Sequence, residues 1–133
     1  MKLKYGKDDI FDCPEGTYRG VLERIAEPKK RINKPCDAQI RLTFRVKTKK
    51  GKEHLVARTF CADLSEGSEL FASLESWLAE EIDSLLDEKG ELELNLLIGR
   101  SADLHITHWN DGSHDTPFVL IVGIFPPGTL VRD

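Results

Sequence analysis

The stretch AQIRLTFRVKT, residues 38–48, decides the fold prediction, because its apolar and polar side chains alternate one by one. In an extended strand, Ile40, Leu42, Phe44 and Val46 share one face, and the polar and basic side chains between them share the other. Such a strand packs one face on a core and leaves the other in water. We therefore predict a β-strand here, with an outer face rich in cations.

The segments around this strand predict further strands. Residues 49–52 (KKGK) have the composition of a hairpin loop, and the residues that follow return as a strand. Gly20, inside the first strand, indicates a bulge or a barrel corner. The four further predicted strands cover residues 16–25, 53–61, 102–109 and 117–125.

The apolar period changes between the third and fourth predicted strands. From Ser68 to Leu86, apolar residues recur every three or four positions, which predicts one α-helix. Ser65 or Ser68 can cap its start. Residues 92–100 fit either a short helical turn or the entry to a strand.

The predicted order is three strands, a helix and two strands. We therefore predict an all-β fold with one helix: a five-stranded Greek-key OB-fold barrel with the helix between strands 3 and 4. The alternative is an α+β domain with an open five-stranded sheet. A length of 133 residues fits one core. We assign 1–15 to an N-terminal arm, 16–128 to the OB-fold domain and 129–133 to a short C-terminal tail.

Composition limits the class of protein. The chain has no apolar run long enough for a membrane helix and no secretory h-region at its start, so we expect a cytoplasmic protein with no membrane partner. Three cysteines, Cys13, Cys36 and Cys61, form no C-x-x-C pair, and we expect no disulfide framework.

Charge is distributed unevenly along the chain. The net charge is only -4, which by itself does not favour a polyanion partner. However, residues 1–60 carry 16 Lys and Arg against 8 Asp and Glu, whereas residues 61–133 carry 3 against 15. Such asymmetry indicates a polyanion-binding surface beside an acidic region, although two ordinary solvated halves would look the same.

Several segments resemble a family of phage-type single-stranded-DNA-binding proteins. They are PEGTYRGVLERI (14–25), TFCADLSEGSELFASLESWL (59–78), LLIGRSADLHITH (96–108) and VGIFPPG (122–128). The resemblance implies an OB-fold and accessory work on single strands in DNA replication or recombination, with replication or recombination proteins as partners. It fixes no contact residue. The chain lacks the long Gly/Gln-rich tail with an acidic tip of the usual bacterial single-strand-binding protein, which puts tail-mediated recruitment in doubt.

We expect single-stranded DNA, or RNA, to cross the second and third strands, where an OB-fold usually binds its ligand. Binding without sequence preference needs cations that follow the phosphates and flat side chains on which bases stack. The outward set of the second strand is Gln39, Arg41, Thr43, Arg45 and Lys47. The neighbouring loops add Lys29, Lys30, Arg31, Lys34, Lys49, Lys50 and Lys52. Arg19 and Arg24 can flank the groove.

Three further side chains complete the predicted interface. Arg58 and Phe60 join it if their side of the third strand faces outward, and Phe60 is core if it does not. Trp109, at the mouth of the loop between the last two strands, can stack on a base or pack at the rim. By contrast, Trp77 lies at helical spacing among leucines, and we assign it and Tyr18 to the core.

We predict no enzyme activity, no cofactor and no metal site. His105 and His108 are three residues apart on a predicted strand and point to opposite faces. No nucleophile elbow, zinc-protease motif or phosphate loop occurs in the sequence. The competing hypotheses are a protein-interaction module that docks through an acidic helix face and, last, a metal-assisted hydrolase. The opposite charges of the two halves also allow a homo-oligomer. The acidic face comprises Glu75, Glu80, Glu81, Asp83 and Asp87.

Overall fold

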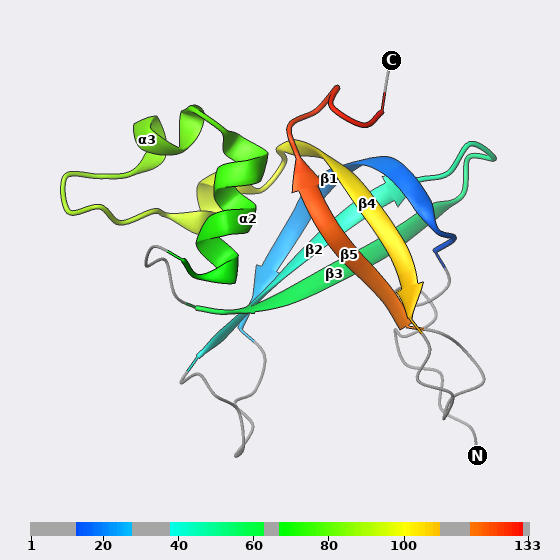
Figure 1. The fold of residues 1–133 in the computed structure, drawn as a ribbon, viewed down its shortest axis with the longest axis horizontal. Helices are drawn as coiled ribbons and strands as arrows, with labels where there is room; N and C mark the ends of the chain where they lie inside the picture. The colour runs from blue at the N-terminus through cyan, green and yellow to red at the C-terminus, as the bar shows by residue number, and fades with distance from the viewer. Residues whose placement is uncertain (1–12, 28–37, 63–66, 110–117, 132–133) are drawn as a thin grey trace.

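The computed structural model describes residues 13–27, 38–62, 67–109 and 118–131. Figure 1 shows strands that coil around a common core, with the helices on one side. The strands are β1 (Gly16–Ala26), β2 (Gln39–Lys47), β3 (Glu53–Cys61), β4 (Ser101–Trp109) and β5 (Phe118–Phe125). The helical segments are α2 (Glu69–Leu78), α3 (Glu81–Leu85) and the 3₁₀ turn η1 (Leu94–Leu97).

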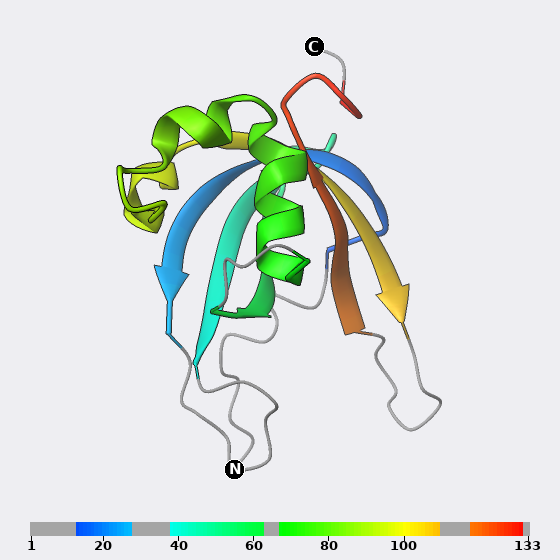
Figure 2. The ribbon, with the colours of Figure 1, turned by 60° about the vertical axis from the view of Figure 1, so that its left-hand side comes forward.

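The five strands form one antiparallel sheet in the order β3-β2-β1-β4-β5. The long strand β1 pairs with β4 through its first half and with β2 through its second half. The edge strands β3 and β5 contact each other, but no backbone pairing closes the sheet in the described residues. Helix α2 contacts both edge strands, and Figure 2 shows it lying over the opening between the two halves of the sheet.

The predicted strands are all present, and β3 has the predicted bounds. The core consists of the inward side chains of the strands and one face of α2, together with Cys13, Ile82 of α3 and Leu97 of η1. Phe44 and Trp77 meet edge to face with ring centroids 5.6 Å apart. The Trp77 indole N–H donates to the Ser101 carbonyl at 2.9 Å, so its one polar atom is satisfied inside the core. The assignment of Trp77 to the core is confirmed.

The prediction of one continuous helix over 68–86 is wrong. Ser68 caps α2 by accepting a hydrogen bond from the Phe71 N–H at 3.0 Å, but the helix ends at Leu78. Ala79 has φ 51°, outside the helical region, and α3 begins two residues later. The chain thus turns while Ile82 stays buried. For residues 92–100, the structure has the helical turn η1 before β4 begins.

Gly20 is needed for close packing rather than for a bulge. A Cβ at this position would lie 2.9 Å from Leu104 Cδ1 and 3.0 Å from Val46 Cγ1, so a side chain does not fit between the strands. The bulge in β1 lies further along, between Leu22 and Arg24.

Cys61 is disulfide-bonded, contrary to the expectation from cysteine spacing, whereas Cys13 is a buried free thiol. Spacing along the chain failed as a guide because a disulfide depends on proximity in the folded protein. In the described part of the chain, no helix has both the length and the apolar character needed to cross a bilayer.

Candidate nucleic-acid interface

Strand register builds the candidate interface, which we call the β1–β3 outer face. Three rows cross the strands on the side away from the core. They are Ala26–Arg41–Thr59, Arg24–Thr43–Ala57 and Val21–Arg45–Leu55. Apart from the arginines, small side chains occupy the two rows that contain Arg41 and Thr43.

The outward set of β2 is confirmed for its three cations, whereas Gln39 is half-buried and Thr43 lies on the outer side but is buried. Arg41, Arg45 and Lys47 are exposed, as the alternation predicts. Thr43 is only 2% exposed, because its short side chain lies on a central strand between Arg24 and Ala57. It therefore contributes shape to the surface but little contact area for a ligand.

Arg41 and Arg45 differ in their partners. Arg41 Nε donates to the Thr59 hydroxyl at 3.2 Å. No carboxylate of the described residues compensates the charge of Arg41. Arg45 pairs with the Glu23 carboxylate on one side and lies 3.5 Å from the Glu53 carboxylate on the other. Because two carboxylates flank it, Arg45 is the weaker candidate for a phosphate contact.

A shallow groove of 680 Å³ crosses the face at this point and contains both glutamates together with Arg24, Arg45, His54 and Leu55. Its charges are mixed, so it does not favour a polyanion as a whole. Arg41 lies outside this groove, whereas Arg24 belongs to its lining. The described residues provide no ion pair for either of them.

Arg24 belongs to the interface more firmly than sequence reasoning indicated. A strict period of two places Arg24 in phase with Leu22, which is fully buried. The bulge after Leu22 inserts one extra residue, and Arg24 then pairs with Thr43 and is exposed. The signal that could have found it is the bulge itself, which the sequence pattern does not specify.

The phase of β3 is now known, and it removes Phe60 from the interface. His54, Val56 and Phe60 face inward, and Phe60 is 1% exposed in the core. The prediction that Phe60 stacks on a base is therefore wrong, because no ring face is accessible. Arg58 shares the inward phase, with its guanidinium 4.7 Å from the Phe60 ring centroid and 4.0 Å from the Glu69 carboxylate. It is half-buried beside α2 and does not join the outer face.

The hairpin between β2 and β3 carries the exposed residues Lys49, Lys50 and Lys52, next to Lys47. Gly51 has φ 84°, a conformation that glycine adopts without strain. The Gly51 N–H donates to the Thr48 carbonyl at 2.9 Å, which closes the turn. The tight turn therefore holds its lysines at the end of the outer face. The predicted contacts Lys29, Lys30, Arg31 and Lys34 lie outside the described residues.

Trp109 is 52% exposed and lies on a different part of the sheet. Its ring stacks on Phe118, with centroids 5.8 Å apart and planes at 24°. Leu120 and Val122 are also exposed on β5. We call these four residues the β4–β5 apolar face.

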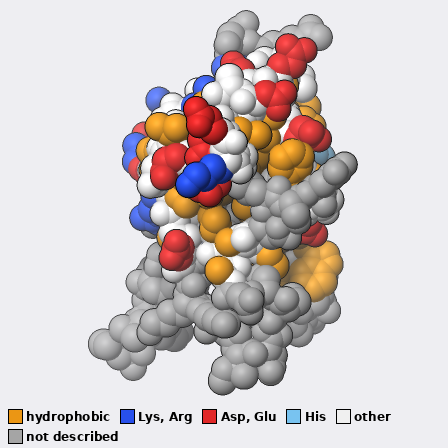
Figure 3. All heavy atoms as spheres, turned by 90° about the vertical axis from the view of Figure 1, so that its left-hand side faces the viewer, with side chains coloured by type: hydrophobic (Ala, Val, Ile, Leu, Met, Phe, Trp, Pro, Cys, Tyr) orange, Lys and Arg blue, Asp and Glu red, His pale blue; other side chains and the backbone are white. Residues whose placement is uncertain are grey.

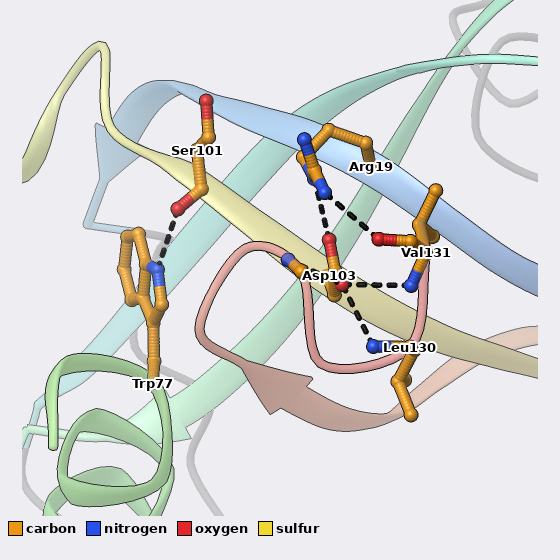
Figure 4. A network of polar contacts seen from close by, with 7 residues as sticks. Arg19, Trp77, Ser101, Asp103, Leu130 and Val131 are labelled. Carbon is orange, nitrogen blue, oxygen red and sulfur yellow. Dashed lines mark hydrogen bonds and ion pairs between the residues drawn. The ribbon is translucent and has the colours of Figure 1, made fainter. Parts of the chain in front are cut away.

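The buried carboxylate of Asp103 lies where β1 pairs with β4, between these two faces (Figure 4). Asp103 accepts from Arg19 Nε at 2.6 Å and from the Leu130 and Val131 N–H groups at 2.8 Å. Burial alone would raise the pKa of the Asp103 carboxyl. The hydrogen bonds from Val131, Arg19 and Leu130 and the Arg19 charge outweigh burial, so its pKa lies below the ordinary value. Arg19 is therefore committed to this carboxylate and is a poor phosphate ligand.

The histidines do not form a metal site in the described residues. His105 is exposed, whereas the His108 ring approaches the Cys13 carbonyl at 2.7 Å. No group of three or more His, Cys, Asp or Glu side chains in the described ranges could hold an ion.

Comparison with known proteins assigns no family to the chain. No protein-family model matches it, and no curated protein matches its sequence. The resemblance to phage-type single-stranded-DNA-binding proteins therefore stays a prediction.

Proposed function

We propose that the chain is an OB-type barrel that binds single-stranded DNA, or RNA in its place, on the β1–β3 outer face. The proposal extends to accessory work in phage-type DNA replication or recombination, in the cytoplasm and without catalysis. Its main support is the outer face that carries Arg24 and Arg41, neither of which has a carboxylate partner among the described residues.

The barrel class is supported by connectivity. An OB-fold has a five-stranded Greek-key sheet with a helix between its third and fourth strands. Here β1 is shared by two halves of the sheet, the edge strands β3 and β5 contact each other, and α2 covers the opening between them. This order brings the outer faces of β2 and β3 together, where a barrel of this class binds its ligand.

Phosphate contacts explain binding without sequence preference. Arginine and lysine contact phosphates whatever the bases are, so affinity falls as salt rises. The experiment titrates the protein into fluorescent oligo(dT) at low and moderate salt and follows anisotropy and tryptophan emission. We expect saturable binding at micromolar protein in low salt, with a steep loss at higher salt. No binding in low salt would remove the proposal.

A second candidate function is docking to a basic protein through the helical side. Figure 3 shows acidic side chains spread over the face that carries α2 and α3, among hydrophobic ones. Glu75, Glu80, Asp83 and Asp87 are exposed, and Glu81 pairs with Arg100. Failure of oligonucleotide binding together with binding of a basic peptide would favour this candidate.

A further inference from the structure

A second groove, of 740 Å³, lies beyond the end of the β1–β3 outer face. The groove lies between the β2–β3 hairpin with its lysines, which we call the lysine hairpin, and the start of β1. The turn that follows β5 lies at its edge. We call this groove the lysine groove. Its lining includes Thr17, Tyr18, Lys47, Thr48, Lys49, Lys50, Lys52 and Val131.

The charge of the lysine groove is strongly positive. Four lysines line it, and among its described lining residues Glu15 is the one acidic side chain. That carboxylate accepts the His108 backbone N–H at 2.8 Å. Lys49 and Lys50 are exposed, and neither forms an ion pair within the described ranges. Hydroxyl and ammonium donors in one groove fit the oxygens of phosphate groups.

The turn after β5 is held in place, so the groove has a fixed wall. The Val131 N–H donates to Asp103, and the Val131 carbonyl accepts from Arg19 Nη2 at 3.0 Å (Figure 4). The Gly128 N–H donates to the same carboxylate at 3.0 Å. Because Asp103 holds this turn against β1 and β4, Val131 stays beside the lysine hairpin.

We propose that the lysine groove is a second phosphate-binding subsite, which takes the sugar–phosphate backbone of the same strand that crosses the β1–β3 outer face. This inference rests on the proposed function. Of the two rings in the described lining, His54 is buried, whereas Tyr18 is partly buried and donates its hydroxyl proton to the Pro14 carbonyl at 2.9 Å. The groove therefore contacts phosphates rather than bases.

Two positive regions then flank a neutralised centre. Glu23 and Glu53 compensate Arg45, which lies on β2 between Arg41 and Lys47. Lys47 is six positions further along β2 than Arg41, about 20 Å at roughly 3.4 Å per residue. That span corresponds to roughly six stacked nucleotides. A ligand that reaches both regions must be at least about this long.

The experiment measures affinity for oligo(dT) of about 4 and about 16 nucleotides across a range of salt, lengths that bracket the usual site of one OB-fold. It uses the full chain and its variants Lys49→Glu, Lys50→Glu and Arg41→Glu. Lys89→Glu is the matched control, since Lys89 is exposed in the acidic region after α3 and changes the net charge equally. Circular dichroism and thermal melting check that each variant is folded.

We expect Lys49→Glu and Lys50→Glu each to lower affinity for the long oligonucleotide about fivefold. Each should also reduce the salt slope, the slope of log affinity against log salt concentration, by about one. The affinity gained on going from the short to the long oligonucleotide should shrink, and Lys89→Glu should match wild type. One outcome would overturn the second subsite and leave the proposed function standing. In it, Arg41→Glu loses affinity, whereas Lys49→Glu and Lys50→Glu bind as tightly as Lys89→Glu. Failure of wild type to bind either oligonucleotide would overturn both.

Discussion

The two outer faces of this sheet have opposite chemistry. The β1–β3 outer face carries arginines among small side chains, whereas β5 has no charged residue, and its Leu120 and Val122 are exposed. Trp109 and Phe118 stack at the end of the second face. The comparison shows that the cations and the most exposed aromatic ring of the described residues do not share a surface. Phosphates and bases would therefore contact different parts of the molecule.

The largest expected effect is a loss of stability at Asp103, on the pair of strands β1 and β4 between the two faces. Asp103→Ala leaves Arg19 and three backbone N–H groups without their acceptor, and we expect a loss of about 3 kcal/mol in the free energy of unfolding. Urea denaturation measures it. A change below about 0.5 kcal/mol would show that the two faces do not depend on this carboxylate.

The same carboxylate predicts a pH dependence. The folded-state pKa of Asp103 lies below its unfolded value of about 3.9, so its contribution to stability is present above the unfolded pKa and is lost as pH falls through the folded pKa. Unfolding free energy measured from pH 6 down to pH 2 should therefore fall less steeply in Asp103→Asn than in wild type. Parallel curves would contradict this assignment.

Arg41→Glu should reduce affinity for oligo(dT) about tenfold, because it places a carboxylate where a cation stood that has no carboxylate partner among the described residues. Arg45→Glu should cost less, about threefold, because Glu23 and Glu53 already neutralise that position. Anisotropy titrations with Lys89→Glu as control measure both. Equal losses at the two arginines would break the distinction between the ends of the β1–β3 outer face.

Trp109→Ala tests whether the β4–β5 apolar face takes part. Stacking of a base on this ring would contribute about 1 kcal/mol, so the substitution should weaken binding about fivefold. The salt slope should stay unchanged, since no cation is removed. Wild-type affinity in this variant would confine the interface to the cationic face.

The smallest expected effect is a gain in affinity for oligo(dT). Glu53→Gln removes one of the two carboxylates beside Arg45 and should strengthen binding about twofold, with a slightly steeper salt slope. Glu53 is exposed, so stability should change by less than about 0.5 kcal/mol. A weaker affinity in this variant would show that Arg45 does not become available to phosphates.

Alternation along residues 38–48 was enough to predict one strand, because one of its faces is buried, whereas the other strands were predicted from β-forming residues and turn signals. It predicted β2 and its exposed Arg41 and Arg45 correctly. It failed for Arg24, because a bulge changes the phase of β1 without a signal in residue types. It also failed at Ala79, since the apolar spacing on either side fits one continuous helix.

Contacts across strands could not be read from the pattern at all. The pairing of Arg45 with Glu23 and Glu53 depends on the register of three strands. The burial of Phe60 depends on which side of β3 meets α2, which the sequence left open. The cations of β2 were therefore predictable. The neutralisation of Arg45 and the burial of the Phe60 ring were not.

The most direct test of the account is a backbone amide NMR titration of the chain with oligo(dT). We predict that the largest shift changes fall on β1, β2 and β3 around Arg24, Arg41 and Thr59, with a second group in the Lys49–Lys52 turn. Changes confined to α2 and α3, or no changes at saturating oligonucleotide, would contradict the account.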